Sequence, residues 1–162
     1  MSYIRRDYYV GLYGEIAEGD FARLSWEAER YVDLHTTGID NVKKLRRFFP
    51  QDEDDAELVK RCVARLTNFL HQIYVAETAA LAAAGYEATE QGMRGKVITS
   101  MSAGNESISY STGAANTTAI DAAVKDKKTR DRMAGEIIWE YLAGVEDANG
   151  VNLLYMGRYP SV

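Results

Sequence analysis

Apolar residues recur at alternating steps of three and four in three parts of the chain, a pattern that predicts helices. The first of these segments is expected to begin with Asp20 as its N-cap and to stop at Gly38. Its apolar positions are Phe21, Leu24, Ala28, Tyr31 and Val32. The segment therefore has one apolar face, which is typical of a helix that packs on a core.

The second segment is the longest and is expected to be the central helix of the fold. It follows the acidic run QDEDDAE, whose carboxylates suit the positive N-terminal end of a helix dipole. Its apolar seam, which no proline interrupts, consists of Val59, Cys62, Leu66, Phe69, Ile73, Ala76 and Ala80. A helix from near Asp55 to Ala84 would be about 45 Å long, more than a domain of this size needs to bury. We therefore expect part of it to contact neighbouring chains.

The third segment covers about residues 117–144 and ends at Gly144. Thr118 and Asp121 have the spacing of a capping box. The apolar positions are Ile120, Val124, Met133, Ile137, Ile138, Tyr141 and Leu142. The polar stretch from Lys125 to Arg132 leaves open whether this segment forms one helix or two.

Between the second and third segments the helical pattern gives way to glycine, serine and threonine. At residues 96–112 the apolar residues instead alternate with polar ones, which predicts a β-hairpin or an extended arm. An isolated pair of strands is only marginally stable in water. We therefore expect this arm to lie against another chain, through Val97, Met101, Ser107, Ile108 and Tyr110.

These elements together predict a mainly α fold in a single domain covering residues 1–162. The chain has 162 residues, of which 46% are hydrophobic, enough for one modest core. We expect a small helical bundle (about 18–84 and 117–144) with a long central helix. An inserted β-hairpin or extended arm (86–116, with its strands at about 96–112) and an extended C-terminal tail (149–162) complete the prediction.

Charge and cysteine content narrow the classes of function. A net charge of -5 argues against strong, sequence-independent binding to nucleic acid. The single cysteine, Cys62, excludes an intrachain disulfide and is expected to be a core residue. No leader or membrane-spanning stretch is evident in the sequence, so we expect folding in the cytoplasm.

Residues with a chemical role are not apparent in the sequence. His35 and His71 lack the spacing of a metal pair, and neither a phosphate-binding loop nor a serine-nucleophile motif is present. The expectation is a protein without catalytic residues, bound metal or cofactor. Two basic clusters, at 43–47 and 125–132, could in principle contact phosphate or an acidic partner, but we favour solvated helix ends or salt bridges between subunits.

Four stretches in order give the chain a resemblance to a known family. They are the tyrosine-rich entry that leads to DFARLSWEAERYVDLHTTG, the central VKRCVARLTNFL, the loop SAGNESISYS, and the closing YLAGV and NLLYMGRY. In the loop, the family pattern falls on Ser102, Gly104, Ser107 and Tyr110. Near the end, methionine stands at position 156 where arginine is common. Nearly the whole chain thus resembles the head-tail connector (adaptor) proteins of tailed bacteriophages.

The resemblance implies a structural virion protein and no catalysed reaction. Roughly a dozen copies would form a ring below the portal protein, located in the virion neck and assembled in the host cytoplasm. The ring would extend the DNA channel and offer a docking surface to the head-completion (stopper) or tail-completion protein. Viral DNA would pass through without sequence-specific binding, which a channel with few clustered cations would ease.

The C-terminal tail carries the portal-docking residues that the resemblance implies. Its apolar side chains follow the expected helix end at Gly144, so we expect them to be exposed and to need a partner. The docking residues are expected to be Leu153, Leu154, Tyr155, Arg158 and Tyr159. Two alternatives stay open: a tail folded back on its own subunit, and a cytoplasmic helical binding or regulatory protein that acts as a dimer.

Overall fold

The computed structural model describes residues 2–83, 86–89, 92–95 and 119–160, which form six helices and two short strands. The helices are α1 (Arg6–Tyr13), α2 (Glu18–His35), α3 (Lys44–Arg47), α4 (Glu53–Ala83), α5 (Ala119–Lys125) and α6 (Lys127–Leu142). The strands β1 (Tyr86–Thr89) and β2 (Gly92–Gly95) pair antiparallel. The predicted mainly α class is confirmed.

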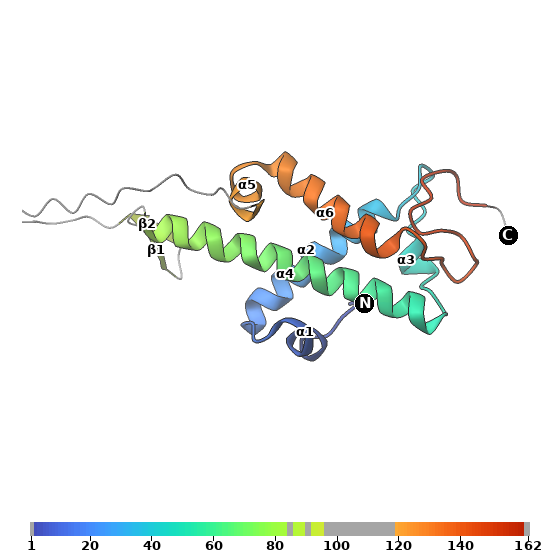
Figure 1. Cartoon of the computed structure of the whole chain (residues 1–162), viewed down its shortest axis with the longest axis horizontal. Helices are drawn as coiled ribbons and strands as arrows, with labels where there is room; N and C mark the ends of the chain where they lie inside the picture. Colours follow the sequence, from blue (N-terminus) through green and yellow to red (C-terminus); the bar gives the residue numbers. More distant parts are fainter. Residues whose placement is uncertain (1, 84–85, 90–91, 96–118, 161–162) are drawn as a thin grey trace, which may run out of the picture.

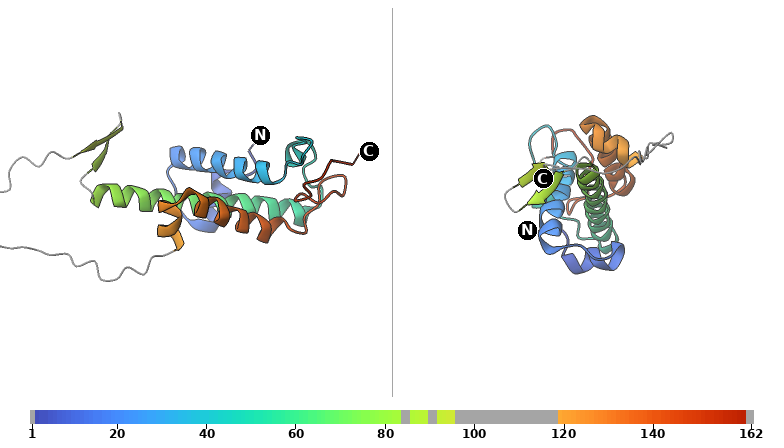
Figure 2. Two further views of the ribbon diagram at one scale, coloured as in Figure 1. Left: turned by 90° about the horizontal axis from the view of Figure 1, so that it is seen from above. Right: turned by 90° about the vertical axis from the view of Figure 1, so that its left-hand side faces the viewer.

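Helix α4 is the centre of the fold. It packs against α2, α6, α5 and α1, and α2 and α6 flank it on two sides (Figures 1 and 2). The predicted seam is confirmed over most of its length, because Val59, Cys62, Leu66, Phe69 and Ile73 are each at most 2% exposed. The final turns of α4 extend beyond α2 (Figure 1), and Ala80 in that part is exposed.

The acidic run before α4 acts as the sequence predicted. The side chain of Asp52 accepts hydrogen bonds from the backbone N–H groups of Asp54 and Asp55, at 3.0 and 3.1 Å. Glu53, Asp54 and Asp55 lie in the first turn, where the helix dipole favours negative charge.

The N-terminal part of the fold differs from the prediction. Helix α2 begins at Glu18 with Ala17 as N-cap, so Asp20 lies inside the first turn and its predicted role as N-cap is wrong. Helix α1 was not predicted, because it is only 8 residues long and contains Gly11. Its Tyr9 is 1% exposed and lies 5.8 Å, centroid to centroid, from the ring of Phe21.

The third segment consists of two helices. Asp126 separates α5 from α6, and its carboxylate accepts hydrogen bonds from the backbone N–H groups of Lys128 and Thr129, at 3.2 and 2.9 Å. An aspartate in extended conformation at this position is a strong N-cap, so the polar stretch starts a new helix.

The arm expected at 96–112 lies outside the described residues, and so do Val97, Met101, Ser107, Ile108 and Tyr110. Strands β1 and β2 precede it, with Tyr86 opposite Gly95 and Thr89 opposite Gly92. They begin directly after α4, with which β1 is in contact.

Candidate interaction surface

The C-terminal tail folds back onto its own subunit. Leu153 is fully buried in the core, and its N–H donates to the carbonyl of Val145 at 2.9 Å. A β-bridge between Glu146 and Asn152 closes the turn between them. The expectation of an exposed tail is therefore wrong for Leu153, because the end of α6 leaves an apolar space that this side chain fills.

A buried lysine holds the tail in place. Lys44 is 1% exposed, and its Nζ donates hydrogen bonds to the carbonyls of Asn152 at 3.1 Å and Tyr155 at 2.5 Å. Desolvation lowers the pKa of this ammonium, and the charges of Asp147 and Asp40 act in the opposite direction. Lys44 is thus neither a solvated residue nor part of a salt bridge between subunits, and our interpretation of the 43–47 cluster is wrong for this residue.

The end of the tail is fastened by loop residues on both sides. The N–H of Tyr159 donates to Asp40 Oδ2 at 2.6 Å, and its hydroxyl donates to Asp147 Oδ2 at 2.7 Å. The Tyr159 ring stacks on Phe48 with centroids 5.1 Å apart. A Cβ on Gly38 would lie 2.6 Å from the carbonyl oxygen of Gly157, so glycine is needed there for close approach of the tail. Helix α2 itself already ends at His35, which corrects the predicted stop at Gly38.

Four of the five predicted docking residues remain at least partly accessible. Tyr155 is 49% exposed, Arg158 is exposed, and Leu154 is half-buried. Tyr159 is also half-buried, but its ring and hydroxyl are engaged within the subunit. Leu154 and Tyr155 are followed directly in the chain by Met156, which is 51% exposed, so three accessible apolar or aromatic side chains are consecutive in the tail.

An apolar recess lies between α2, α6 and the tail. It has a volume of about 680 Å³ and is lined by Leu34, His35, Gly135, Ile138, Trp139, Leu154 and Met156. We call it the α2–α6 recess. Leu34 and Trp139 are large apolar side chains that are 61% and 59% exposed. A cluster of large exposed apolar side chains is typical of an interaction site.

Sequence reasoning missed Leu34 and Trp139, although a signal was present. Both residues fall outside the buried stripes of their helices, which are carried by Ala28 and Val32 in α2 and by Ile138 and Leu142 in α6. A large apolar side chain off the core-facing stripe has no place in the core of its own subunit. Such positions are candidates for contact with a partner.

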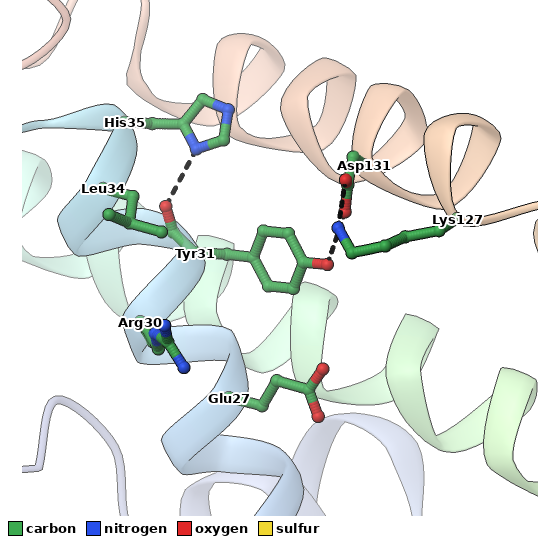
Figure 3. Close-up of a pocket in the computed structure, with 7 residues that line it drawn as sticks. All are labelled: Glu27, Arg30, Tyr31, Leu34, His35, Lys127 and Asp131. Atoms are coloured by element: carbon green, nitrogen blue, oxygen red, sulfur yellow. Dashed lines mark hydrogen bonds and ion pairs between the residues drawn. The ribbon is translucent and has the colours of Figure 1, made fainter.

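A more polar pocket of about 420 Å³ shares Leu34 and His35 with the recess. Its lining residues are drawn in Figure 3. The Tyr31 hydroxyl donates to Asp131 Oδ1 at 2.7 Å, and Lys127 forms an ion pair with the same carboxylate. His35 Nδ1 is 2.9 Å from the Tyr31 carbonyl, so this nitrogen carries a proton and donates it.

These contacts tie α6 to α2 and do not prepare a reactive group. Burial, followed by the hydrogen bond to Asp131, raises the pKa of Tyr31 to about 12, so its hydroxyl stays protonated at neutral pH. The hydrogen bond from Lys127, followed by that from Tyr31, lowers the pKa of Asp131. The Asp131 carboxylate is therefore ionised at neutral pH and paired with both Lys127 and Tyr31, which suits a structural contact better than acid–base chemistry.

Most of the basic residues in the second cluster, at 125–132, form ion pairs within the subunit. Arg130 pairs with Glu77 at 2.7 Å and Arg132 with Glu136 at 2.5 Å.

Among the described residues, no group of three or more histidine, cysteine, aspartate or glutamate side chains is placed to hold a metal ion. Within the same residues, no helix is long and apolar enough to span a membrane.

Comparison of the chain with models of known protein families, with curated proteins and with solved structures gave no match.

Proposed function

We propose that this chain is a head-tail connector subunit of a tailed bacteriophage, a structural protein of the virion neck. Copies of the chain form a ring below the portal protein, extend the DNA channel and present a docking surface to the stopper or tail-completion protein. DNA passes through the channel without sequence-specific contacts. The proposal starts from the resemblance of the four ordered stretches to this family.

The observation that carries the proposal is the position of the α2–α6 recess beside the tail. Leu154 and Met156 come from the tail to which the resemblance assigns portal docking, and they share the recess with Leu34 and Trp139. Tryptophan and methionine are enriched in protein interfaces, and a few such anchors carry most of the binding energy. The recess thus offers a protein partner a larger apolar surface than the tail alone.

In this proposal, the end of α4 and the arm expected at 96–112 contact neighbouring proteins of the neck. Val75 and Leu81 on α4 are 53% and 38% exposed, and this helix extends beyond α2. The arm expected at 96–112 follows shortly after α4 in the sequence, and in this proposal the strands predicted there pair with an adjacent subunit or a neck protein.

Substitution in the recess tests portal docking directly. Leu34→Glu and Trp139→Glu each place a charge in the recess and should weaken binding to assembled portal of the same virus by more than about 1 to 2 kcal/mol. Because both side chains are largely exposed, the fold should be retained. Leu12→Glu is the matched control, since Leu12 is 42% exposed but lies on α1 outside the recess.

The readouts are affinity for immobilised portal rings, mass in solution and far-UV circular dichroism. Equal affinity of the two recess variants and the Leu12→Glu control would remove the recess from the docking site. A wild-type chain that forms dimers but never binds portal would instead support the dimeric regulator.

A further inference from the structure

The turn that holds the end of the tail contains the only asparagine in the chain that is followed by glycine. Asn149 and Gly150 are both exposed, and Gly150 has a φ of 74°, a conformation that glycine adopts without strain. Neither residue lines the α2–α6 recess or the polar pocket that shares residues with it. This pair can therefore be tested independently of the α2–α6 recess.

Asn149 takes part in a chain of hydrogen bonds that fastens Tyr159. Its Nδ2 donates to the Tyr159 hydroxyl at 2.9 Å, and the same hydroxyl donates to Asp147 Oδ2 at 2.7 Å. A hydroxyl has a single proton, so once it donates to Asp147 it can only accept from residue 149. The contact therefore requires a donor at position 149, which an amide provides and a carboxylate does not.

An asparagine side chain that precedes glycine is open to attack by the backbone nitrogen of that glycine, which no side chain obstructs. At this site Gly150 N loses its proton and bonds to Asn149 Cγ, the Cγ–Nδ2 bond breaks, and Nδ2 leaves as ammonia. Water then opens the cyclic imide at one of its C–N bonds and leaves aspartate or isoaspartate at position 149. Overall, one amide and one water become one carboxylate and one ammonium ion, so water is the only co-reactant.

Two hydrogen bonds of the turn slow this reaction but do not prevent it. Gly150 N–H donates to the Asp147 carbonyl at 2.9 Å, and Asn149 Nδ2 is engaged by Tyr159. Asn149 and Gly150 are exposed, so each hydrogen bond opens readily and slows the reaction between about twofold and tenfold. The rate of the reaction therefore depends on the contact with Tyr159.

We propose that Asn149 is a deamidation site and that its modification frees the end of the tail. The new carboxylate faces a hydroxyl that already donates its proton to Asp147, and two carboxylates around one hydroxyl oxygen repel each other. Isoaspartate also lengthens the backbone of the turn, in which the N–H groups of residues 149, 150 and 151 all bond to Asp147. Tyr159 is therefore held less firmly in either product.

The release is confined to the residues near Tyr159. The hydrogen bond from its N–H to Asp40, at 2.6 Å, is exposed, so water competes for it once the hydroxyl contact is lost. Leu153 stays buried, and its N–H still donates to the Val145 carbonyl. The inference goes beyond the proposed connector function and does not depend on it.

Peptide mapping by mass spectrometry tests the chemical step. The full chain is incubated at mildly alkaline pH, where the backbone nitrogen loses its proton more readily, and is sampled over several weeks. We expect a mass increase of one unit to build up at Asn149 but not at Asn41, which is also exposed but precedes valine. Tyr159→Phe removes the hydroxyl and keeps the ring, so it should speed the reaction between about twofold and tenfold. If Asn149 stays as unchanged as Asn41, or if Tyr159→Phe leaves the rate unaltered, the proposal is overturned.

Amide hydrogen exchange, measured by NMR, tests the release of the tail. Asn149→Asp reproduces the aspartate product, so the Tyr159 N–H should exchange about tenfold faster than in the wild-type chain. The Leu153 N–H should keep its exchange rate. Asn149→Gln is the matched control, because it keeps a neutral amide and should change the exchange of Tyr159 much less. Equal Tyr159 exchange in Asn149→Asp and the wild-type chain, or equal acceleration in Asn149→Asp and Asn149→Gln, would overturn the proposal.

Discussion

Removing the residues after Asn149 should destabilise the helical fold itself. The truncation deletes Leu153, which is fully buried, and the carbonyls of Asn152 and Tyr155 that accept hydrogen bonds from Lys44. Deleting a buried leucine side chain costs about 2 to 5 kcal/mol, and hydrogen bonds to a charged group contribute about 1.5 to 3 kcal/mol each.

Once the tail is absent, water can hydrogen-bond to the Lys44 ammonium. Only part of the stabilisation from its two hydrogen bonds to the tail is therefore lost. We therefore expect the free energy of unfolding to fall by about 4 to 7 kcal/mol. Small domains have total stabilities of about 5 to 15 kcal/mol, so the truncated chain should be marginally folded or unfolded.

A double-mutant cycle isolates the role of Lys44. In the full chain, Lys44→Met should cost about 1 to 3 kcal/mol, because the Tyr155 carbonyl loses the only hydrogen-bond donor it has among the described residues. In the truncated chain that carbonyl is gone, and the same substitution should cost nothing. Lys43→Met, at the exposed neighbouring position, should have little effect in either background.

The assay is urea unfolding followed by far-UV circular dichroism, with a truncation after Arg158 as a second background if the shorter chain does not fold. In that longer truncation the Lys44 acceptors remain, so Lys44→Met should keep its full cost. A truncation after Asn149 that costs less than about 1 kcal/mol would refute the reasoning, since a buried leucine alone should cost more. Equal effects of Lys44→Met in the full chain and in a folded chain truncated after Asn149 would also refute it.

The remaining predictions concern the central helix. Phe69→Ala should lower the free energy of unfolding by about 3 to 5 kcal/mol, because Phe69 is only 2% exposed. Val75→Ala, at a 53% exposed position on α4, is the control and should have little effect. Calorimetry of both variants checks this. Burial raises the pKa of the Cys62 thiol from its usual 9.0 to about 12. The protonated thiol therefore contributes to the free energy of unfolding in full below pH 9.0, and this contribution is lost as the pH rises from 9.0 to about 12. When the free energy of unfolding is measured against pH, the Cys62→Ala variant should lose less stability at alkaline pH than the wild-type chain. The same pH dependence in both chains would contradict the contribution of the buried Cys62 thiol.

The sequence by itself determined the parts of the fold that depend on near neighbours along the chain. The spacing of Val59, Cys62 and Leu66 predicted the buried face of α4, because residues three and four apart share one side of any α-helix. The acidic run predicted the start of the same helix, where the Asp52 carboxylate reaches backbone N–H groups two and three residues away. Such contacts need no knowledge of the rest of the molecule.

Only the tertiary structure decided the contacts between parts of the chain that are far apart. Lys44 meets acceptors 108 and 111 residues later in the sequence, and nothing in the local pattern distinguishes it from exposed Lys43. Leu153 was expected at the surface because no helix follows it, yet the end of α6 leaves space for it in the core. Likewise, Leu34 and Trp139 form one recess only because α2 and α6 lie side by side. The physical reason is that burial depends on which surfaces meet, and helical periodicity specifies one face of each element but not its partner.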